Sequence, residues 1–129
     1  MSDTEYKVPT DLQYTKSHEW VKEEDGVYTV GLTDFAQDHM GDIVYIDLPD
    51  VDDDVELEDS FAEAESVKAV SEIFSPVAGT VREINEDIDD DPAVVNQDPY
   101  GNWLVKVEGE PGELMNAEEY IAFCETEDI

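Results

Sequence analysis

Residues 64–81 read AESVKAVSEIFSPVAGTV, and within them a lone lysine, Lys68, separates two runs of β-forming residues. The runs Phe61 to Val67 and Ala69 to Phe74 are predicted to be strands, because they are short, contain regularly placed apolar residues and are bounded by turn residues. A tight hairpin over about residues 61–77 would hold Lys68 at its tip. An ε-amine in that place is exposed on a long flexible stem, within reach of a modifying enzyme.

Turn residues divide much of the remaining chain into further short strands. Asp25-Gly26 is a hairpin signal, since glycine adopts a positive φ without a steric penalty. Pro49 ends another run, because proline cannot donate a hydrogen bond to a ladder. The predicted strands are Val27 to Leu32, Ile43 to Leu48, Gly79 to Ile84 and Trp103 to Val107. Short strands separated by turns predict a mainly β fold, either a β-sandwich or a flattened barrel.

Two helices are expected to interrupt the strands. Thr33 can cap a short helix that runs through Met40 and ends at Gly41. Asn116, with Glu119 three residues later, makes a capping-box-like start for a C-terminal helix over about residues 116–124. One face of that helix should dock on the sheet, and it carries Ala117, Tyr120, Ile121 and Cys124. No linker-like stretch divides the chain, so residues 1–129 are predicted to form a single domain.

The charge of the chain is strongly unbalanced: 36 acidic and 6 basic residues give a formal net charge of −30. Such a charge repels nucleic acid and anionic membranes. The acids are distributed along the whole chain rather than collected in one tail, which predicts a protein adapted to the salt-rich cytoplasm of a halophile, where salt screens the repulsion. Two acidic stretches, Asp50 to Asp59 and Glu86 to Asp91, are expected to be solvated turns. Partners from the same cytoplasm would be acidic as well, so contacts should be apolar or salt-dependent.

Neither a metal site nor a membrane segment is indicated. Cys124 is the only cysteine, which excludes an intrachain disulfide and a thiolate cluster. His18 and His39 lack further ligands at a suitable spacing, so both are assigned packing or surface roles. Trp20 and Trp103 are expected to be core anchors. The chain has no apolar run long enough to span a membrane and no signal-like start, which predicts a soluble cytoplasmic protein; a monomer is expected.

From the residues alone, Lys68 has two interpretations. It can be a modified lysine, since a chain with only 6 basic residues has one of them between two predicted strands. It can equally be a surface lysine that balances Glu65 and Glu72, because exposed lysines are common and their ion pairs are weak. A hydrolase that uses two carboxylates is a further possibility, but among 36 acids chance pairs carry almost no information.

The flanks of Lys68 resemble the lipoylation motif of the glycine cleavage system H-protein family, in which Glu-Ser-Val-Lys-Ala is the usual form. The flanking residues here are Glu65, Ser66, Val67 and Ala69. Further blocks are similar to the family and follow the same order: YTKSHEWV at 14–21, VGLTDFAQ at 30–37, GDIV at 41–44, DLP at 47–49, VN at 95–96, DPYG at 98–101 and WL at 103–104. The resemblance covers the chain from about Tyr14 to Cys124.

The resemblance implies a lipoyl/biotinyl-type barrel-sandwich hybrid that is a carrier and not an enzyme, without catalytic residues of its own. Lipoate would be joined by an amide to Lys68 by a lipoate ligase or lipoyl transferase. The carrier would take an aminomethyl group from glycine decarboxylase (the P protein) to the aminomethyltransferase (the T protein), and reducing equivalents to dihydrolipoyl dehydrogenase (the L protein). Tethering the cargo raises its effective concentration at each enzyme.

The resemblance also implies a cradle for the amine at the end of the loaded arm. Ser17 and Glu19 match the family's Ser-x-Glu near the N-terminus. Glu72, four residues after Lys68, matches a position that is usually Asp, and its extra methylene makes it the weaker match. A carboxylate can hold a cationic amine through a charge-assisted hydrogen bond.

Besides the hydrolase, three alternatives stay open on the sequence. An H-like protein can serve mainly as a lipoyl donor or relay. A biotinyl domain or a lipoyl domain of a 2-oxo-acid dehydrogenase is another carrier, although those typically flank the lysine with Met or Asp, where this chain has Val67 and Ala69. From a different class, an acidic binding protein with an unmodified Lys68 has the same composition. Intact mass separates the carriers from the binding protein.

Overall fold

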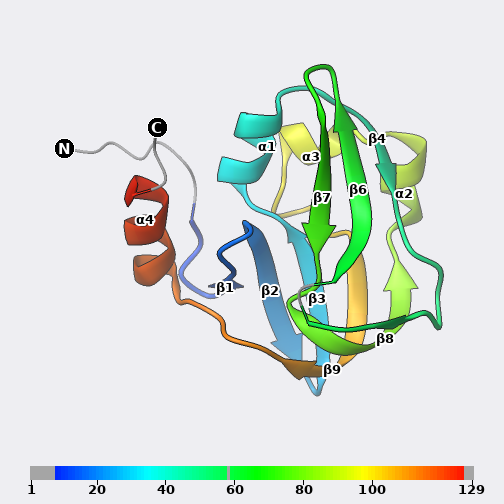
Figure 1. Ribbon diagram of the computed structural model, residues 1–129, viewed down its shortest axis with the longest axis vertical. Coiled ribbons are helices and arrows are strands. Elements are labelled where there is room, and N and C mark those ends of the chain that lie inside the picture. Colours follow the sequence, from blue (N-terminus) through cyan, green and yellow to red (C-terminus); the bar gives the residue numbers. More distant parts are fainter. Residues whose placement is uncertain (1–7, 58, 127–129) are drawn as a thin grey trace.

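The computed structural model describes residues 8–57 and 59–126, and in it two antiparallel sheets form a flattened sandwich (Figure 1). The larger sheet has the strand order β1-β2-β3-β9-β8-β5 and the smaller the order β4-β6-β7. Neither order closes on itself within the described chain, so the prediction of a flattened β-sandwich is confirmed. The strands are β1 (Gln13–Tyr14), β2 (Glu19–Glu24), β3 (Val27–Leu32), β4 (Ile43–Asp47), β5 (Asp54–Val55), β6 (Ser60–Ser66), β7 (Val70–Phe74), β8 (Val77–Ile84) and β9 (Val105–Pro111). The helices are α1 (Asp34–Met40), α2 (Glu86–Asp90), α3 (Val94–Gln97) and α4 (Ala117–Thr126).

The turn between β2 and β3 is the one that the sequence predicts. Asp25 has φ 55° and Gly26 has φ 84°, and Glu24 pairs with Val27 on either side of them. Two consecutive positive φ values are typical of a type I′ turn, whose twist matches the right-handed twist of the strands it joins. The local turn therefore sets the register of the hairpin that begins the larger sheet.

The main core lies between the two sheets and is aliphatic. Val30 on β3 and Val81 on β8 are fully buried in the larger sheet, and Ile46 on β4 and Ile73 on β7 are fully buried in the smaller. Because side chains alternate along a strand, the residues on either side of Ile73 point away from this core. The outer face of β6 and β7 is thus left open to solvent.

A second, aromatic core anchors α4 beside β1, at one end of the larger sheet (Figure 1). The rings of Tyr14 and Tyr120 stack with their centroids 4.7 Å apart. The helix begins with the predicted capping box, in which the Asn116 N–H donates to Glu119 Oε1 (3.0 Å) and the Glu119 N–H donates to Asn116 Oδ1 (2.8 Å). The predicted docking face is also confirmed, except that Ile121 is only partly buried.

Helix α1 begins and ends where the sequence predicts. The Ala36 N–H donates to the Thr33 hydroxyl at 3.1 Å, and Gly41 follows α1 with φ 78°. A positive φ is accessible to glycine without steric cost, so Gly41 lets the chain turn sharply into β4. This turn brings the end of α1 close to the β6–β7 hairpin.

Strands β8 and β9 of the larger sheet differ from the prediction in their bounds. β9 runs from Val105 to Pro111, whereas the sequence predicted a strand from Trp103 to Val107. The carbonyl of Trp103 instead accepts a hydrogen bond from the Asn85 side chain at 2.8 Å. β8 begins at Val77, before the predicted start at Gly79. Gly79 lies opposite Gly109 on β9, where a Cβ would overlap the facing backbone. Two glycines in register thus allow the ladder to extend beyond the predicted start of the strand.

The prediction that Glu86 to Asp91 is a solvated turn is wrong, because most of this stretch is α2. The Asn85 side chain caps the helix by accepting from the Asp87 N–H at 3.2 Å. Acidic side chains in a first turn interact favourably with the helix dipole, and Ile88 is fully buried. The single apolar residue among five acids therefore fixes the helix against the core. Helix α3 was likewise not predicted.

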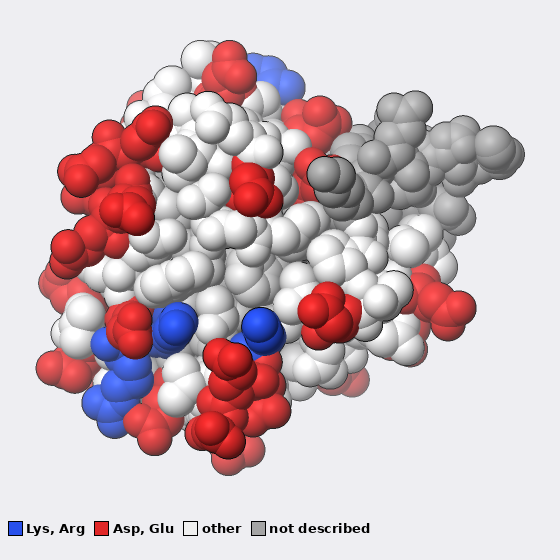
Figure 2. Space-filling view, turned by 180° about the vertical axis from the view of Figure 1, so that it is seen from behind, with Lys and Arg blue, Asp and Glu red and all other residues white. Residues whose placement is uncertain are grey.

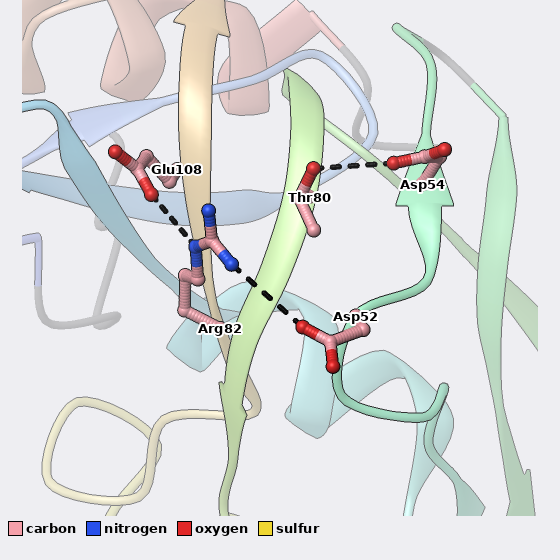
Figure 3. A network of polar contacts seen from close by, with 5 residues as sticks. All are labelled: Asp52, Asp54, Thr80, Arg82 and Glu108. Carbon is pink, nitrogen blue, oxygen red and sulfur yellow. Dashed lines mark hydrogen bonds and ion pairs between the residues drawn. The ribbon is translucent and has the colours of Figure 1, made fainter.

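The other acidic stretch, Asp50 to Asp59, is a turn only in part, since it contains β5. Arg82, the only arginine of the chain, lies with its Nε 2.7 Å from Glu108 and a terminal nitrogen 3.7 Å from Asp52 (Figure 3). The Thr80 hydroxyl donates to Asp54 at 3.1 Å. The contacts with Asp52 and Asp54 tie the acidic stretch to β8, the neighbour of the edge strand β5.

On the face shown in Figure 2, acidic side chains lie mostly around a central region of uncharged residues, with few basic side chains among them. Within the described part of the chain, no helix is long and apolar enough to cross a membrane. Cys124 is buried, as predicted. One acid departs from this pattern, because Glu19 is 1% exposed.

Candidate attachment site and the adjoining cavity

Lys68 lies at the tip of the β6–β7 hairpin, as the sequence predicts, and the tip stands above α1 and α3 in Figure 1. Glu65 pairs with Val70 across the two strands. The Ser66 N–H donates to the Ala69 carbonyl at 2.8 Å, which closes the turn and leaves Val67 and Lys68 as its two central residues. Lys68 is exposed. The hairpin therefore presents a primary amine at its outermost point.

The Ser66 hydroxyl organises this turn. It accepts from the backbone N–H groups of Lys68 and Ala69, each at 3.2 Å, and it lies 3.1 Å from the Ala69 carbonyl, to which it donates. Neither Val67 nor Lys68 has a positive φ, so the turn is not of the type that most two-residue hairpins use. The serine of the Glu-Ser-Val-Lys-Ala motif thus supplies, through its side chain, hydrogen bonds that hold the lysine backbone in place.

The end of α1 supports the tip from below. The Val67 N–H donates to the Asp42 carbonyl at 3.1 Å. The stem of Lys68 passes over Gly41, where a Cβ would come 2.9 Å from its Cε. Asn96 on α3 secures this support: its amide nitrogen donates to the Gly41 carbonyl (2.9 Å), and its Oδ1 accepts from the Ile43 N–H (2.8 Å). Sequence reasoning assigned no role to Asn96, since its partners lie more than fifty residues away.

No carboxylate lies within ion-pair distance of Lys68 among the side chains of residues 8–57 and 59–124. Glu65 and Glu72 are both exposed, and Glu72 pairs across the strands with Glu63 rather than with the lysine. The interpretation of Lys68 as a lysine that balances these two acids is therefore not supported by the structure. Its amine projects without an intramolecular charge partner in the described chain.

Glu19 is the buried half of the predicted cradle. Its Oε1 accepts from the Ser17 hydroxyl at 2.6 Å and from the Thr15 hydroxyl at 2.7 Å, and its Oε2 accepts from the Phe74 N–H at 3.4 Å. Burial raises the pKa of Glu19, and the three hydrogen bonds oppose that rise because they favour the ionised form. The structure thus places a carboxylate with little solvation beside the end of β7.

A left-handed residue between Ser17 and Glu19 shapes this turn. His18 has φ 73°, which is uncommon for a residue with a side chain. Its ring stacks on Phe35 at 4.4 Å and its Nδ1 lies 2.8 Å from the Tyr120 hydroxyl. The packing role predicted for His18 is confirmed. No group of residues that could bind a metal ion occurs in the described chain, and His39 is an exposed residue stacked on Phe35 at 4.0 Å.

A cavity of about 640 Å³ opens beside Ser17 and Glu19. Its walls come from the turn before β2, the segment between β7 and β8, and the segment between β9 and α4. The lining residues are Thr15, Lys16, Ser17, Glu19, Leu57, Phe74, Ser75, Pro76, Gly112, Glu113, Leu114, Met115 and Glu119. Thr15 was not singled out from the sequence, although it holds Glu19 through both its hydroxyl and its N–H, which donates to the Glu19 carbonyl at 3.0 Å.

Glu72 stands apart from Ser17 and Glu19. It does not line the cavity but lies two residues before Phe74, which does. Glu72 and Phe74 fall on the same outer face of β7, because they are two positions apart. The structure therefore brings two of the three predicted cradle residues together and puts the third on the strand between Lys68 and the cavity.

The stability of the protein should depend on pH through Glu19. A raised pKa means that the folded protein still holds this proton above the ordinary value of 4.5, so the free energy of unfolding falls as the pH rises through the folded-state pKa. Glu19→Gln has no carboxyl group to titrate at this position, so it lacks this pH-dependent contribution to stability. Unfolding by denaturant at constant high salt should show the variant gaining stability relative to the native protein as the pH rises above 4.5. Parallel pH profiles would contradict the raised pKa.

Gly41→Ala should lower stability by about 1–3 kcal/mol, because alanine is strained at φ 78° with ψ −157°. Gly26→Ala is the matched control, since Gly26 also has a positive φ (84°) but has nothing near its Cβ position. Both variants should unfold at lower denaturant concentrations than the native protein, because each places alanine at a positive φ, while the flexible stem of Lys68 can move away from the new methyl group. Only Gly41→Ala should change the rate at which a small acylating reagent modifies Lys68. Equal rates in both variants would show that the stem does not rest on Gly41.

Comparison with known proteins gives one family. The family model described as "Glycine cleavage H-protein" matches residues 12–127. The glycine cleavage system H protein of Oceanobacillus iheyensis is 48% identical, covering 92% of this chain and 98% of the relative. That of Vibrio parahaemolyticus is 50% identical, covering 90% and 97%. The crystal structure of a glycine cleavage system H protein from Mycobacterium marinum matches with a TM-score of 0.86 at 39% identity, covering 89% of this chain and 97% of that one.

These matches extend over nearly the whole chain and agree with the two-sheet fold. The structure also presents Lys68 as an exposed primary amine at the tip of a hairpin. The chain therefore belongs to the glycine cleavage H-protein family, whose members are lipoate-bearing carriers rather than enzymes.

Proposed function

We propose that this chain carries lipoate on Lys68 and shuttles an aminomethyl group from glycine decarboxylase to the aminomethyltransferase, and reducing equivalents to dihydrolipoyl dehydrogenase. The observation that carries the proposal is the pairing of an exposed, unpaired amine at a hairpin tip with a cavity that contains a buried carboxylate. When bound, the dithiolane of lipoate would supply the sulfur that takes the cargo, and it would accept the electron pair that the resulting dithiol later passes on.

Lys68 fits this cofactor. The amine is exposed, the residues around it make a turn that does not depend on its charge, and no described carboxylate pairs with it. Amide formation removes the positive charge of a lysine. A lysine engaged in an ion pair would lose that pair on acylation, whereas here the charge can be removed without breaking a contact in the described structure.

Glu19 and Ser17 would hold the amine at the end of the loaded arm. An ammonium group that reaches the cavity meets Glu19 Oε1, already fixed by two hydroxyl groups. Because the carboxylate is 1% exposed, its attraction for a cation is weakly screened. Held there, the cargo would be shielded from water. Glu72 lies on the outer face of β7 between the tip and the cavity, so it would contact the arm outside the cavity.

Reconstitution tests the function. The lipoylated chain should gain the mass of an aminomethyl group when it is incubated with glycine decarboxylase and glycine, and lose it with release of ammonia when the aminomethyltransferase and tetrahydrofolate are added. The unmodified chain should gain nothing. A lipoylated chain that glycine decarboxylase leaves unchanged would instead favour a lipoyl donor or another lipoyl carrier. Sedimentation of the same sample tests the expected monomer.

A further inference from the structure

Four apolar side chains gather around Lys68 on a surface that is otherwise strongly acidic. Val44, Tyr45, Val67 and Val70 are 52%, 48%, 67% and 58% exposed. Only two other large hydrophobic residues in the described chain are exposed, Val51 (47%) and Leu57 (43%). We call the four residues the collar.

The strand register places the collar around the lysine. Tyr45 on β4 and Val70 on β7 both lie opposite Glu65 on β6, so the three side chains form one row on the outer face of the small sheet. Val67 is the turn residue next to Lys68. Val44 sits at the irregularity between Ile43 and Tyr45, where the register shifts. An extra residue at such a place points its side chain away from the regular alternation, and here it is exposed.

Burial does not account for the collar. The opposite face of the same strands supplies the core through Ile46, Ala64 and Ile73, so the sheet is already stabilised from that side. Val67 and Val70 could be polar at no loss to that core. Solvent-exposed apolar groups that cluster are typical of contact surfaces, whereas single ones need no explanation.

We propose that the collar is the docking surface for the enzyme that attaches lipoate to Lys68. This inference rests on the proposed function. The reacting atom is the lysine nitrogen itself, which stands only one side-chain length from the backbone of the turn. An enzyme that reaches it must approach the residues that flank the turn. Enzymes that use the finished arm meet its far end instead and need not approach so closely.

The composition of the collar suits such a partner in high salt. At about 1 M salt the Debye length is about 3 Å, so attraction between exposed charges is weak, while apolar burial is retained. The partner surface should be an apolar depression with a cationic group facing Glu65, which stands between Tyr45 and Val70. This agrees with the expectation from the sequence that contacts are apolar or salt-dependent.

Attachment kinetics test the collar. The reaction transfers the acyl carbon of a lipoyl adenylate to the lysine nitrogen; the acyl C–O bond breaks, AMP leaves and the nitrogen loses a proton. The unmodified full-length chain, a lipoate ligase, lipoate and ATP supply all components, and intact mass follows the product. Val44→Ser and Val70→Ser should each raise the KM for the chain about tenfold with little change in kcat, and the double variant should raise it further.

Val51→Ser is the matched control, because Val51 is 47% exposed but lies in the acidic stretch before β5. It should behave as the native chain does. The circular dichroism of all variants should coincide, since none of the three positions is buried.

The possible results distinguish docking of the attaching enzyme on the collar from the binding of other partners there. If Val44→Ser and Val70→Ser stay within twofold of Val51→Ser, the docking surface is wrong although the function stands. A native chain that takes no lipoyl group at Lys68 overturns both. A native chain that sediments as a dimer, and as a monomer after Val70→Ser, would assign the collar to a second copy. Variants that attach lipoate normally but load poorly from glycine would assign it to glycine decarboxylase.

Discussion

Glu19→Gln should release the loaded arm at least tenfold faster than the native protein does. Truncating one partner of a buried, hydrogen-bonded charge pair costs about 2–5 kcal/mol, and every 1.4 kcal/mol is a factor of ten. Glu19 is 1% exposed and fixed by three donors, so a cationic amine in the cavity would meet a carboxylate of that kind. The measurement is the rate at which the isolated, aminomethyl-loaded chain loses its cargo to water, followed by intact mass.

Glutamine keeps the size of the side chain and can still accept from Ser17 and Thr15, so the fold should persist. Glu113→Gln is the matched control, because Glu113 lines the same cavity but is exposed. It removes an equal charge and should change the rate by less than twofold, since exposed charges are well screened. Equal rates for the native protein and Glu19→Gln would show that this carboxylate does not hold the arm.

Thr15→Val should reproduce part of that effect, since it removes one of the two hydroxyl groups that fix Glu19 Oε1. Ser17→Ala removes the other. Because both hydroxyls act on one oxygen, the effects of the two substitutions should not add. This pattern distinguishes a fixed carboxylate from a general loss of negative charge at the cavity.

Lowering the salt concentration should unfold the protein. The formal net charge is −30 on 129 residues, and between 1 M and 0.1 M salt the Debye length rises from about 3 Å to about 10 Å, so that each acid is repelled by more of its neighbours. On the outer face of the small sheet, Asp47, Glu63 and Glu72 lie directly opposite one another across three strands. Such like-charge neighbours destabilise a sheet. Circular dichroism during a salt titration gives the measurement.

Two controls separate charge screening from other effects of salt. A neutral osmolyte at the same osmolarity should not replace the salt. Glu63→Lys places a cation between Asp47 and Glu72 and should lower the salt concentration at which half of the protein is folded. It should do so more than Glu56→Lys, which makes the same change of charge outside this row. A fold that is indifferent to salt, and to both substitutions, would contradict the account of the acidic surface.

Features of the fold that depend on neighbouring residues were predictable from the sequence. The Asp25-Gly26 turn, the cap at Thr33 and the capping box of α4 all follow from residues within one turn of each other. The hairpin that holds Lys68 was predictable for the same reason, since its strands are adjacent in the chain.

Features that depend on distant partners were not predictable. The ladder of β8 and β9 continues past its expected bounds because Gly79 meets Gly109 across the sheet. The two acidic stretches look alike in the sequence, yet the second contains α2 because Ile88 packs in the core. Asn96 is an ordinary polar residue until the fold brings Gly41 and Ile43 beside it.

The site was predictable to the extent that a motif carried it. Ser17 and Glu19 lie together at the cavity, and Lys68 stands at a hairpin tip, but nothing in the sequence shows that Glu72 lies outside the cavity. The collar around Lys68 was also not predictable, because only the pairing of β4 and β7 with β6 brings Val44 and Val70 to the same part of the sheet. A valine in a strand is usually buried, and exposure is decided by which face of the sheet the register assigns to it.

The central claim is that the Lys68 amine is the point of lipoate attachment. Peptide-resolved mass spectrometry of the chain isolated from its own host, beside a Lys68→Arg variant expressed in the same cells, tests it directly. We expect a lipoyl-sized increment on the peptide that contains Lys68 and none on Lys106, Lys22 or any peptide of the variant. A native chain without that increment, or a variant that still carries it elsewhere, would contradict the account.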